Sequence, residues 1–214
     1  MHPSLVLWDW NGTLLDDVDL CVDALNRLLA RFHYPQRYDK TQYREIFCFP
    51  VQDYYVRAGF DFSRTPFDEL ARSYMEDYIP ASAACPLADG ALEALDLFSG
   101  AGVRQVVLSA SRRDTLEQQV SQRGIRSRFD RLLGLENIYA RSKVDIGLAY
   151  LREEGFAPDR AVMIGDSVHD AEVAAAMGVP CVLQCAGHQS RSALQAAGVP
   201  VTGSVLEAAR RILT

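Results

Sequence analysis

From Pro86 to the end of the sequence, short apolar runs alternate with segments of helical periodicity, and no other feature constrains the fold as strongly. The apolar runs lie within residues 103–111, 160–166 and 180–187, and segments that favour helices separate them. Strands that alternate with helices in this way predict an α/β fold with a doubly wound, mostly parallel sheet. Such sheets bind ligands beyond the carboxyl ends of their strands.

The segment SLVLWDWNG, residues 4–12, is a further apolar run without alternation, which is typical of a strand buried on both faces. Residues 15–85 show a different pattern, a succession of three stretches that favour helices. The second of them is rich in aromatic residues and is interrupted by Pro50. We therefore predict that residues 1–14 and 86–214 form the catalytic α/β core. Residues 15–85 are predicted to form an inserted, all-helical cap domain.

The composition excludes several classes of protein. With 214 residues, 49% of them hydrophobic, the chain can bury a sizeable core. Its net charge of −6 offers no basic surface to a phosphate backbone, so we expect no nucleic-acid partner. It has no apolar run of about 18 residues and no secretory leader, so we expect no membrane association. Five cysteines without zinc-site spacing favour free thiols in a cytoplasmic protein, either monomer or dimer.

Polar side chains stand at the predicted carboxyl ends of three strands. Asp9 and Asn11 follow the first strand, Ser109 ends the second, and Asp166 closes the run VMIGD. Two carboxylates that converge at one crevice repel each other unless a cation lies between them, and hard oxygen ligands suit Mg²⁺. Asp170 is either a further part of the metal site or the cap of the following helix.

Two further features indicate an anionic ligand. Gly12 and Thr13 allow a tight turn that presents backbone N–H groups to an anion. Lys143 is one of only two lysines among 22 basic residues, and it opens a predicted helix, where the helix dipole disfavours a cation. An interaction with a phosphoryl oxygen and with the Asp9 carboxylate would account for this lysine; a solvated surface position is the alternative.

Four segments resemble, in order and spacing, the four motifs of the haloacid dehalogenase (HAD) superfamily. They are DWNGT (Asp9–Thr13), Ser109 in VVLSAS, Lys143, and GDSVHD (Gly165–Asp170). The resemblance covers essentially the whole chain, and it implies a Rossmann-like core with a helical cap. It also implies a Mg²⁺-dependent phosphatase that acts on a small phosphorylated metabolite.

The resemblance also implies roles for individual residues. Asp9 would be the nucleophile, forming an aspartyl-phosphate, and a metal ligand. The backbone carbonyl of Asn11 and the carboxylate of Asp166 would be the other ligands, and Ser109 and Lys143 would hold the transferring phosphoryl group. These roles agree with the chemistry of phosphoryl transfer, which needs positioning and charge neutralisation.

The second position of the first motif departs from the phosphatases of this superfamily, which carry an aspartate there as general acid and base. This chain has Asn11, and an amide cannot carry a proton across at neutral pH. General acid–base help is worth roughly 10²- to 10⁴-fold, so its loss predicts weak activity or a restriction to good leaving groups such as aryl or acyl phosphates. His169 and His188 could replace the acid, with a structural role as the alternative for each.

Three other interpretations remain open. Phosphonate hydrolases of the superfamily lack this acid and use a cap lysine, but Lys40, the one lysine of the predicted cap, lies earlier than that role requires. A phosphotransferase would keep the same core and a long-lived phosphorylated Asp9. A non-catalytic protein that binds phosphorylated ligands would have no use for a buried nucleophile.

The predicted cap would close over the phosphoryl group and select the leaving group. Arg44, Tyr54 and Arg57 are its polar candidates for substrate binding, and Ala110 joins them from the core beside Ser109. Phe47, Phe49 and Phe60 are expected in the core of the cap, since large aromatic side chains are mostly buried. Arg112 and Arg113 could meet a second anionic group or lie on the surface.

Overall fold

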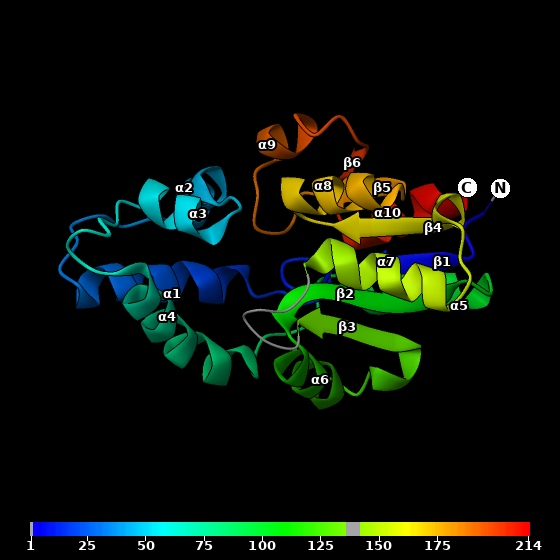
Figure 1. Ribbon diagram of the computed structural model, residues 1–214, viewed down its shortest axis with the longest axis horizontal. Coiled ribbons are helices and arrows are strands. Elements are labelled where there is room, and N and C mark those ends of the chain that lie inside the picture. Colours follow the sequence, from blue (N-terminus) through cyan, green and yellow to red (C-terminus); the bar gives the residue numbers. More distant parts are fainter. Residues whose placement is uncertain (1, 136–141) are drawn as a thin grey trace.

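The computed structural model describes residues 2–135 and 142–214, and a six-stranded, fully parallel sheet forms its centre (Figure 1). The strand order is β3-β2-β1-β4-β5-β6, so the chain winds outward from β1 in both directions. The strands are β1 (Leu5–Trp8), β2 (Arg104–Arg112), β3 (Arg131–Leu135), β4 (Ala161–Gly165), β5 (Cys181–Gln184) and β6 (Val201–Thr202). The predicted doubly wound α/β fold is confirmed.

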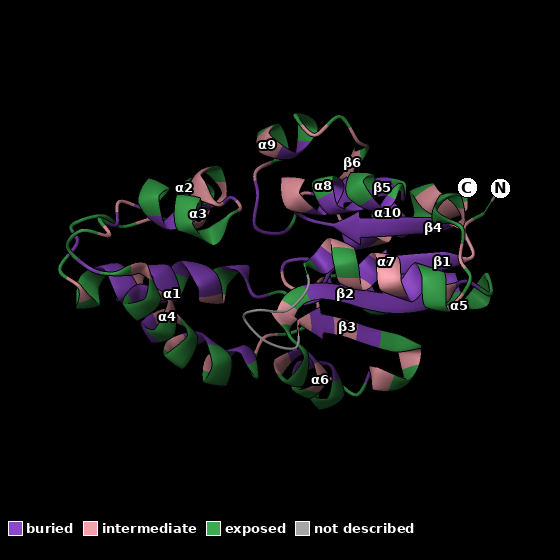
Figure 2. Cartoon of the chain, in the orientation of Figure 1, coloured by how far each residue is buried: buried purple, intermediate pink, exposed green. Residues whose placement is uncertain are grey.

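Strand β1 is central because both of its faces are apolar and both of its edges are paired. Leu5 lies opposite Arg104 of β2 on one side and opposite Ala161 of β4 on the other. Val6 and Trp8 point into one hydrophobic cluster, while Leu5 and Leu7 point into the other. The alternation of side chains along a strand thus places β1 between two cores, and Figure 2 shows it buried throughout.

Helices cover both faces of the sheet. One hydrophobic cluster joins the sheet to α5 (Ala91–Gly100), α6 (Arg113–Gln122) and α10 (Val205–Leu213). The other joins it to α7 (Lys143–Glu153), α8 (Val168–Met177) and α9 (Arg191–Gln195). Short 3₁₀ turns, η1 (Arg126–Arg128) and η2 (Pro158–Arg160), precede β3 and β4. None of the helices in the described part of the chain is long and apolar enough to cross a membrane.

Between β1 and α5 the chain forms a separate group of helices, here called the helical insert (α1–α4). Its members are α1 (Val18–Arg31), α2 (Lys40–Ile46), α3 (Val51–Arg57) and α4 (Phe67–Ser82). A third hydrophobic cluster, distinct from the two at the sheet, packs these helices together. In Figure 1 the arrowheads of β3 and β4 point toward this insert.

The two connections between sheet and insert lie side by side. Leu15 forms an antiparallel bridge with Leu87, and the N–H of Asp16 donates to the carbonyl of Pro86 at 3.0 Å. The N–H of Ala88 donates to the carbonyl of Leu14 at 2.9 Å. These bonds hold the insert at the carboxyl end of β1, directly beside the residues that follow that strand.

Candidate active site

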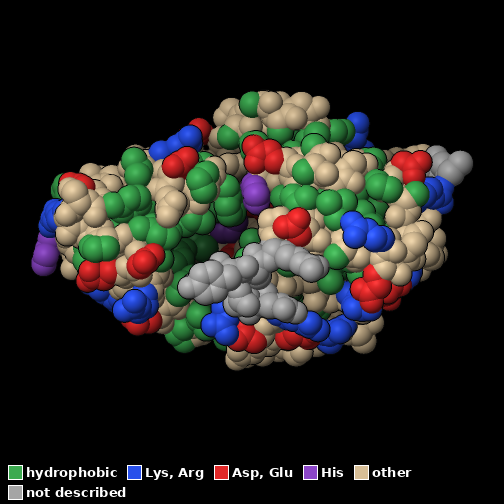
Figure 3. Space-filling view, in the orientation of Figure 1, with side chains coloured by type: hydrophobic (Ala, Val, Ile, Leu, Met, Phe, Trp, Pro, Cys, Tyr) green, Lys and Arg blue, Asp and Glu red, His purple; other side chains and the backbone are tan. Residues whose placement is uncertain are grey.

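A cavity of about 400 Å³ lies between the helical insert and the carboxyl ends of the strands. Figure 3 shows the hollow that separates the two parts of the molecule. Its wall combines Asp9 from the end of β1, Lys143 from the start of α7 and Asp166 from the end of β4 with aromatic side chains of the insert. The fold therefore brings together polar residues that lie more than 150 positions apart in the sequence.

Lys143 joins two carboxylates at the centre of this cavity. Its Nζ lies 2.6 Å from Oδ1 of Asp9 and 2.6 Å from Oδ1 of Asp170, and all three side chains are buried. Burial alone would lower the pKa of Lys143, but Asp170 and Asp9 hold it above its ordinary value. The ammonium is therefore permanently charged, and it stands at the first position of α7 because two carboxylates outweigh the unfavourable helix dipole.

Asp166 completes a group of three carboxylates. Single oxygens of Asp9, Asp166 and Asp170 lie within 4.8 Å of one another. Burial raises the pKa of Asp9 to about 8, against the attraction of Lys143, and burial raises that of Asp166 to about 6. One ammonium cannot neutralise three buried carboxylates, and their hard oxygen donors fit a divalent cation such as Mg²⁺.

Asp170 takes part in the cap of the following helix, one of the two roles considered from the sequence, and it also contacts Lys143. It is the third residue of α8, and its Oδ2 accepts hydrogen bonds from the N–H and the hydroxyl of Ser167 in a capping box. Its other oxygen accepts from Lys143. A Cβ at Gly165 would lie 2.4 Å from the Asp170 side chain, so the strand must end in glycine to let this carboxylate approach.

The Asn11 amide is held in one orientation by three partners. Its Nδ2 donates to Oδ2 of Asp17 at 2.9 Å and to the hydroxyl of Tyr78 at 2.7 Å. Its Oδ1 accepts from the hydroxyl of Ser111 at 2.7 Å. Because Tyr78 belongs to α4, this amide connects the first motif to the helical insert as well as to the end of β2.

The turn after Asn11 donates hydrogen bonds to two carboxylates of the site. Gly12 has φ +71°, a conformation that favours glycine, and its N–H donates to Oδ1 of Asp17 at 2.8 Å. The hydroxyl of Thr13 donates to Oδ1 of Asp166 at 3.2 Å, while its N–H donates to the carbonyl of Trp10. Both N–H groups thus donate within the protein. That of Gly12 donates to a carboxylate, so its anionic partner is a side chain, and that of Thr13 donates to a backbone carbonyl.

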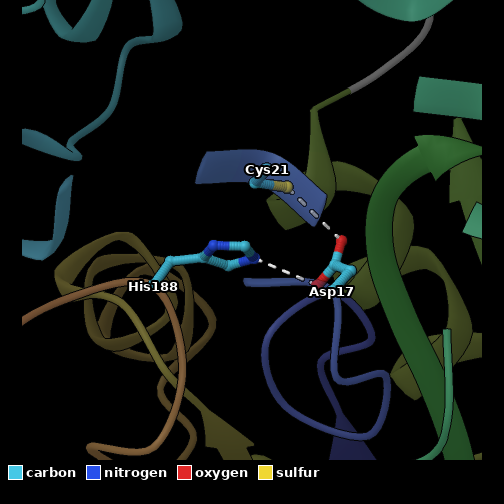
Figure 4. Close-up of side chains that lie close together, drawn as sticks. All are labelled: Asp17, Cys21 and His188. Atoms are coloured by element: carbon cyan, nitrogen blue, oxygen red, sulfur yellow. Dashed lines mark hydrogen bonds and ion pairs between the residues drawn. The ribbon is translucent and has the colours of Figure 1, made fainter. Parts of the chain in front are cut away.

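A buried ion pair lies beside this turn (Figure 4). Nε2 of His188 is 3.2 Å from Oδ1 of Asp17, and Sγ of Cys21 is 3.8 Å from the other carboxylate oxygen. Burial alone would lower the pKa of His188, but Asp17 and Asp166 raise it to about 9. The positive imidazolium in turn keeps the pKa of Asp17 below its ordinary value despite burial. Nδ1 of His188 lies 2.9 Å from the hydroxyl of Tyr43, so the imidazole also connects core and insert.

The remaining predicted site residues lie at the edge of the cavity or away from it. Ala110 lines it, whereas Ser109 is buried just behind and accepts a hydrogen bond from the N–H of Ser111 at 3.0 Å. Arg44 donates to the carbonyls of Gly187 and Ala186.

All three predicted substrate-binding residues of the insert, Arg44, Tyr54 and Arg57, are absent from the described wall. Tyr54 is 3% exposed within the cluster of the insert, and Arg57 is exposed on α3. Phe60 is buried in the cluster as expected, and Phe47 packs against that cluster while it also lines the cavity. Phe49, which we expected in the core of the insert, lines the cavity instead.

Several residues of the site had no recognisable signal in the sequence. They are Asp17, Tyr43, Tyr74, Tyr78 and Ser111. Asp17 follows a second aspartate, and local pattern does not show that Asp16 is exposed and Asp17 buried. The tyrosines fall on the apolar faces of helices, where helical spacing indicates packing rather than contact with a ligand.

Comparison with known proteins places this geometry among related chains. A family profile described as "Haloacid dehalogenase-like hydrolase" matches residues 6–184. The chain is 30% identical over 186 residues to the tyrosine-protein kinase PtkA of Mycobacterium tuberculosis (strain ATCC 25618 / H37Rv). That match covers 85% of this chain and 62% of PtkA, so the chain spans about three fifths of the length of the curated relatives it matches.

Two solved structures share the fold over nearly their full length. One is the haloacid dehalogenase-like hydrolase SP0104 of Streptococcus pneumoniae, with a TM-score of 0.82, 18% identity, and coverage of 98% of each chain. The other is described as a predicted phosphatase of Clostridium acetobutylicum, with a TM-score of 0.79, 23% identity, and coverage of 100% of this chain and 99% of that one.

Proposed function

Because the chain belongs to the haloacid dehalogenase-like hydrolases, we propose that it is a Mg²⁺-dependent phosphatase that uses Asp9 as its nucleophile. The observation that carries the proposal is the position of Asp9, whose Oδ1 accepts from Lys143 while Asp166 and Asp170 lie beside it. A small phosphorylated metabolite is the proposed substrate, and the five free thiols support a cytoplasmic location.

Each residue of the site has a separate role in the proposed phosphoryl transfer. Asp9 attacks phosphorus with one carboxylate oxygen, and the ammonium of Lys143 orients that carboxylate and stabilises negative charge on the phosphoryl oxygens. Asp9, Asp166 and the backbone carbonyl of Asn11 would hold Mg²⁺, which supplies further charge neutralisation and keeps Asp9 ionised. Asp170 positions Lys143 through the 2.6 Å contact.

Asn11 determines which leaving groups are favoured. Its amide is fixed by Asp17, Tyr78 and Ser111, and it has no proton to transfer to the departing oxygen. Neutral alcohols need that proton more than phenols or carboxylic acids do, because their oxyanions are more basic. We infer that aryl or acyl phosphates react faster than alkyl phosphates.

The experiment measures turnover of phenyl phosphate and acetyl phosphate with Mg²⁺, with EDTA, and in Asp9→Asn. We expect turnover that requires both Mg²⁺ and Asp9. Hydroxylamine-labile phosphate, the mark of an aspartyl-phosphate, should appear on the unaltered protein and be absent from Asp9→Asn. Asp159→Asn, an exposed carboxylate on η2, is the matched control and should behave as the unaltered chain. Turnover that persists in Asp9→Asn would refute the proposal.

A phosphotransferase is the second candidate, and the name of the 30% identical relative, a tyrosine-protein kinase, favours testing it. In that case a tyrosine hydroxyl rather than water would accept the phosphoryl group from Asp9. Incubation with acetyl phosphate and a tyrosine-containing peptide, followed by detection of phosphotyrosine, distinguishes transfer from hydrolysis. The phosphonate interpretation has less support, since Lys40 lies outside the described cavity wall and pairs with Asp19 at 2.8 Å.

A further inference from the structure

The wall of the cavity opposite Asp9 is built almost entirely from aromatic and apolar side chains of the helical insert. They are Tyr43, Phe47, Phe49, Tyr74, Met75 and Tyr78. Met75 is 40% exposed although it is apolar, so it has no complete packing partner within the described structure. A polarizable methionine beside several rings is suited to contact with an apolar, aromatic ligand.

Two of the three tyrosine hydroxyls of this wall already have partners in the protein. The hydroxyl of Tyr43 lies 2.9 Å from His188, and that of Tyr78 donates to Asp17 at 2.6 Å. The described insert residues on the wall include no lysine or arginine, and their only carboxylate, Asp17, is paired with His188. Arg112 lines the cavity from the core side, but it pairs with Asp114. Against the insert, a sugar or a carboxylate-bearing leaving group would therefore exchange its bonds to water for unpaired contacts.

Stacking fixes the rings of the wall in place. Phe47 stacks on His188 with 4.9 Å between ring centroids, and Phe49 stacks on His169 at 4.6 Å. Tyr74 and Tyr78 stack at 6.0 Å. Rings that are held by neighbours lose little freedom when a flat ligand packs against them, so the wall is preorganised for an aromatic group.

We propose that the substrates are phosphate monoesters of phenols, with the aromatic ring of the leaving group held against this wall. The inference rests on the proposed function and deepens it. An oxygen of Asp9 bonds to phosphorus while the bond from phosphorus to the aryl oxygen breaks, and the aryl oxygen leaves with the electron pair and takes a proton from water. A second water then attacks the phosphorus of the aspartyl-phosphate, which releases phosphate and restores the Asp9 carboxylate. The proton that this water loses neutralises the hydroxide left by the first. Asn11 and the aromatic wall, two independent features, thus favour the same leaving group.

The test separates the shape of the leaving group from its acidity. The value of kcat/KM is measured for phenyl phosphate, for hexafluoroisopropyl phosphate, whose alcohol is acidified by fluorine, and for acetyl phosphate. We expect phenyl phosphate to exceed the fluoroalkyl ester by at least about tenfold. Phe49→Ala and Met75→Ala should reduce that ratio, while Val56→Ala, an exposed apolar residue of α3 outside the described wall, should leave it unchanged. Thermal unfolding of each variant shows whether it is folded.

The outcomes separate this inference from the proposed function. A ratio near one in the folded, unaltered protein, with turnover of acetyl phosphate that depends on Asp9, overturns the aromatic assignment and leaves the phosphatase standing. No turnover of any of the three esters overturns both. A phosphotyrosyl peptide is the last substrate tested. Its turnover identifies protein tyrosine as a source of the phenol, whereas turnover of phenyl phosphate without turnover of the peptide identifies free phenols. Either result supports the proposal.

Discussion

Nε2 of His188 lies 3.2 Å from Oδ1 of Asp17, and this buried pair joins the loop after β5 to the residue that precedes α1. The side chains are 6% and 1% exposed, so the charges compensate each other away from water. Breaking a buried pair by removing one partner leaves the other charge uncompensated, which is strongly destabilising. The pair is therefore a point at which the stability of the fold and the geometry of the site depend on each other.

His188→Gln should lower the free energy of unfolding by about 3 kcal/mol near neutral pH. The pKa of His188 is raised to about 9 from 6.5, so its contribution is fully present below about pH 6.5 and is lost as the pH rises through 9. Urea unfolding of both proteins between pH 6 and 10, in EDTA, measures this difference. His2→Gln, at an exposed position, is the control. If the difference in unfolding free energy between the two proteins does not shrink as the pH rises from 6 to 10, the ion pair is contradicted.

Lys143→Met should lower kcat/KM for an aryl phosphate by roughly 10²- to 10³-fold, because the ammonium stabilises charge on the phosphoryl group and orients Asp9. The chain contains a matched control in its only other lysine. Lys40 also pairs with an aspartate, Asp19, but both side chains are exposed, so Lys40→Met should change neither activity nor stability appreciably. Steady-state kinetics with Mg²⁺ test both variants, and equal effects would remove Lys143 from the reaction.

Asn11→Asp should not by itself produce an efficient alkyl phosphatase. The new carboxylate would face Asp17, whose Oδ2 now accepts a hydrogen bond from the Asn11 amide, and two like charges at that distance repel. The double variant Asn11→Asp with Asp17→Asn exchanges the two side chains, so that one amide again donates to one carboxylate. A double-mutant cycle of unfolding free energies should therefore show a favourable coupling of about 1–2 kcal/mol.

The matched control for this exchange is Asp16→Asn, which changes the exposed neighbour of Asp17. The changes in unfolding free energy caused by Asp16→Asn and Asn11→Asp should add within about 0.5 kcal/mol when the two are combined. Turnover of an alkyl phosphate should be faster in the exchanged pair than in Asn11→Asp alone. If both cycles are additive, the Asn11 amide does not depend on Asp17.

The metal-free protein should lose stability as the pH rises from about 4 to 8. The pKa of Asp9 is raised to about 8 and that of Asp166 to about 6, both from 3.8, so the folded state binds more protons than the unfolded state over this range. Their contribution is present below about pH 4 and is lost as the pH rises through these values. Thermal unfolding in EDTA across this range, with Asp166→Asn for comparison, measures the slope.

Addition of Mg²⁺ should raise the melting temperature most at the alkaline end of that range, where the carboxylates have lost their protons. Asp166→Asn should reduce the gain, and Asp159→Asn, which alters an exposed carboxylate, should keep it. A gain of equal size in both variants would mean that Mg²⁺ binds elsewhere.

Long, strongly patterned segments were predictable from the sequence, and short ones were not. The buried run at β1 and the alternation after Pro86 predicted the parallel sheet, because strands covered on both faces must be apolar throughout. Strand β6 has two residues and α9 has five, so neither contains enough positions for a period to show. Both take their form from the neighbouring strand and helices.

The sequence by itself determined the fold class and the positions of Asp9 and Asp166, since each follows an apolar strand whose end must lie at one edge of the sheet. Tertiary structure alone decided which polar residues meet there. Asp17 and His188 are separated by 171 positions, and no local pattern indicates that they pair. Burial, charge and hydrogen bonding between distant segments set the orientation of Asn11, the raised pKa of Asp9 and the aromatic wall, because these depend on distances in space rather than on order along the chain.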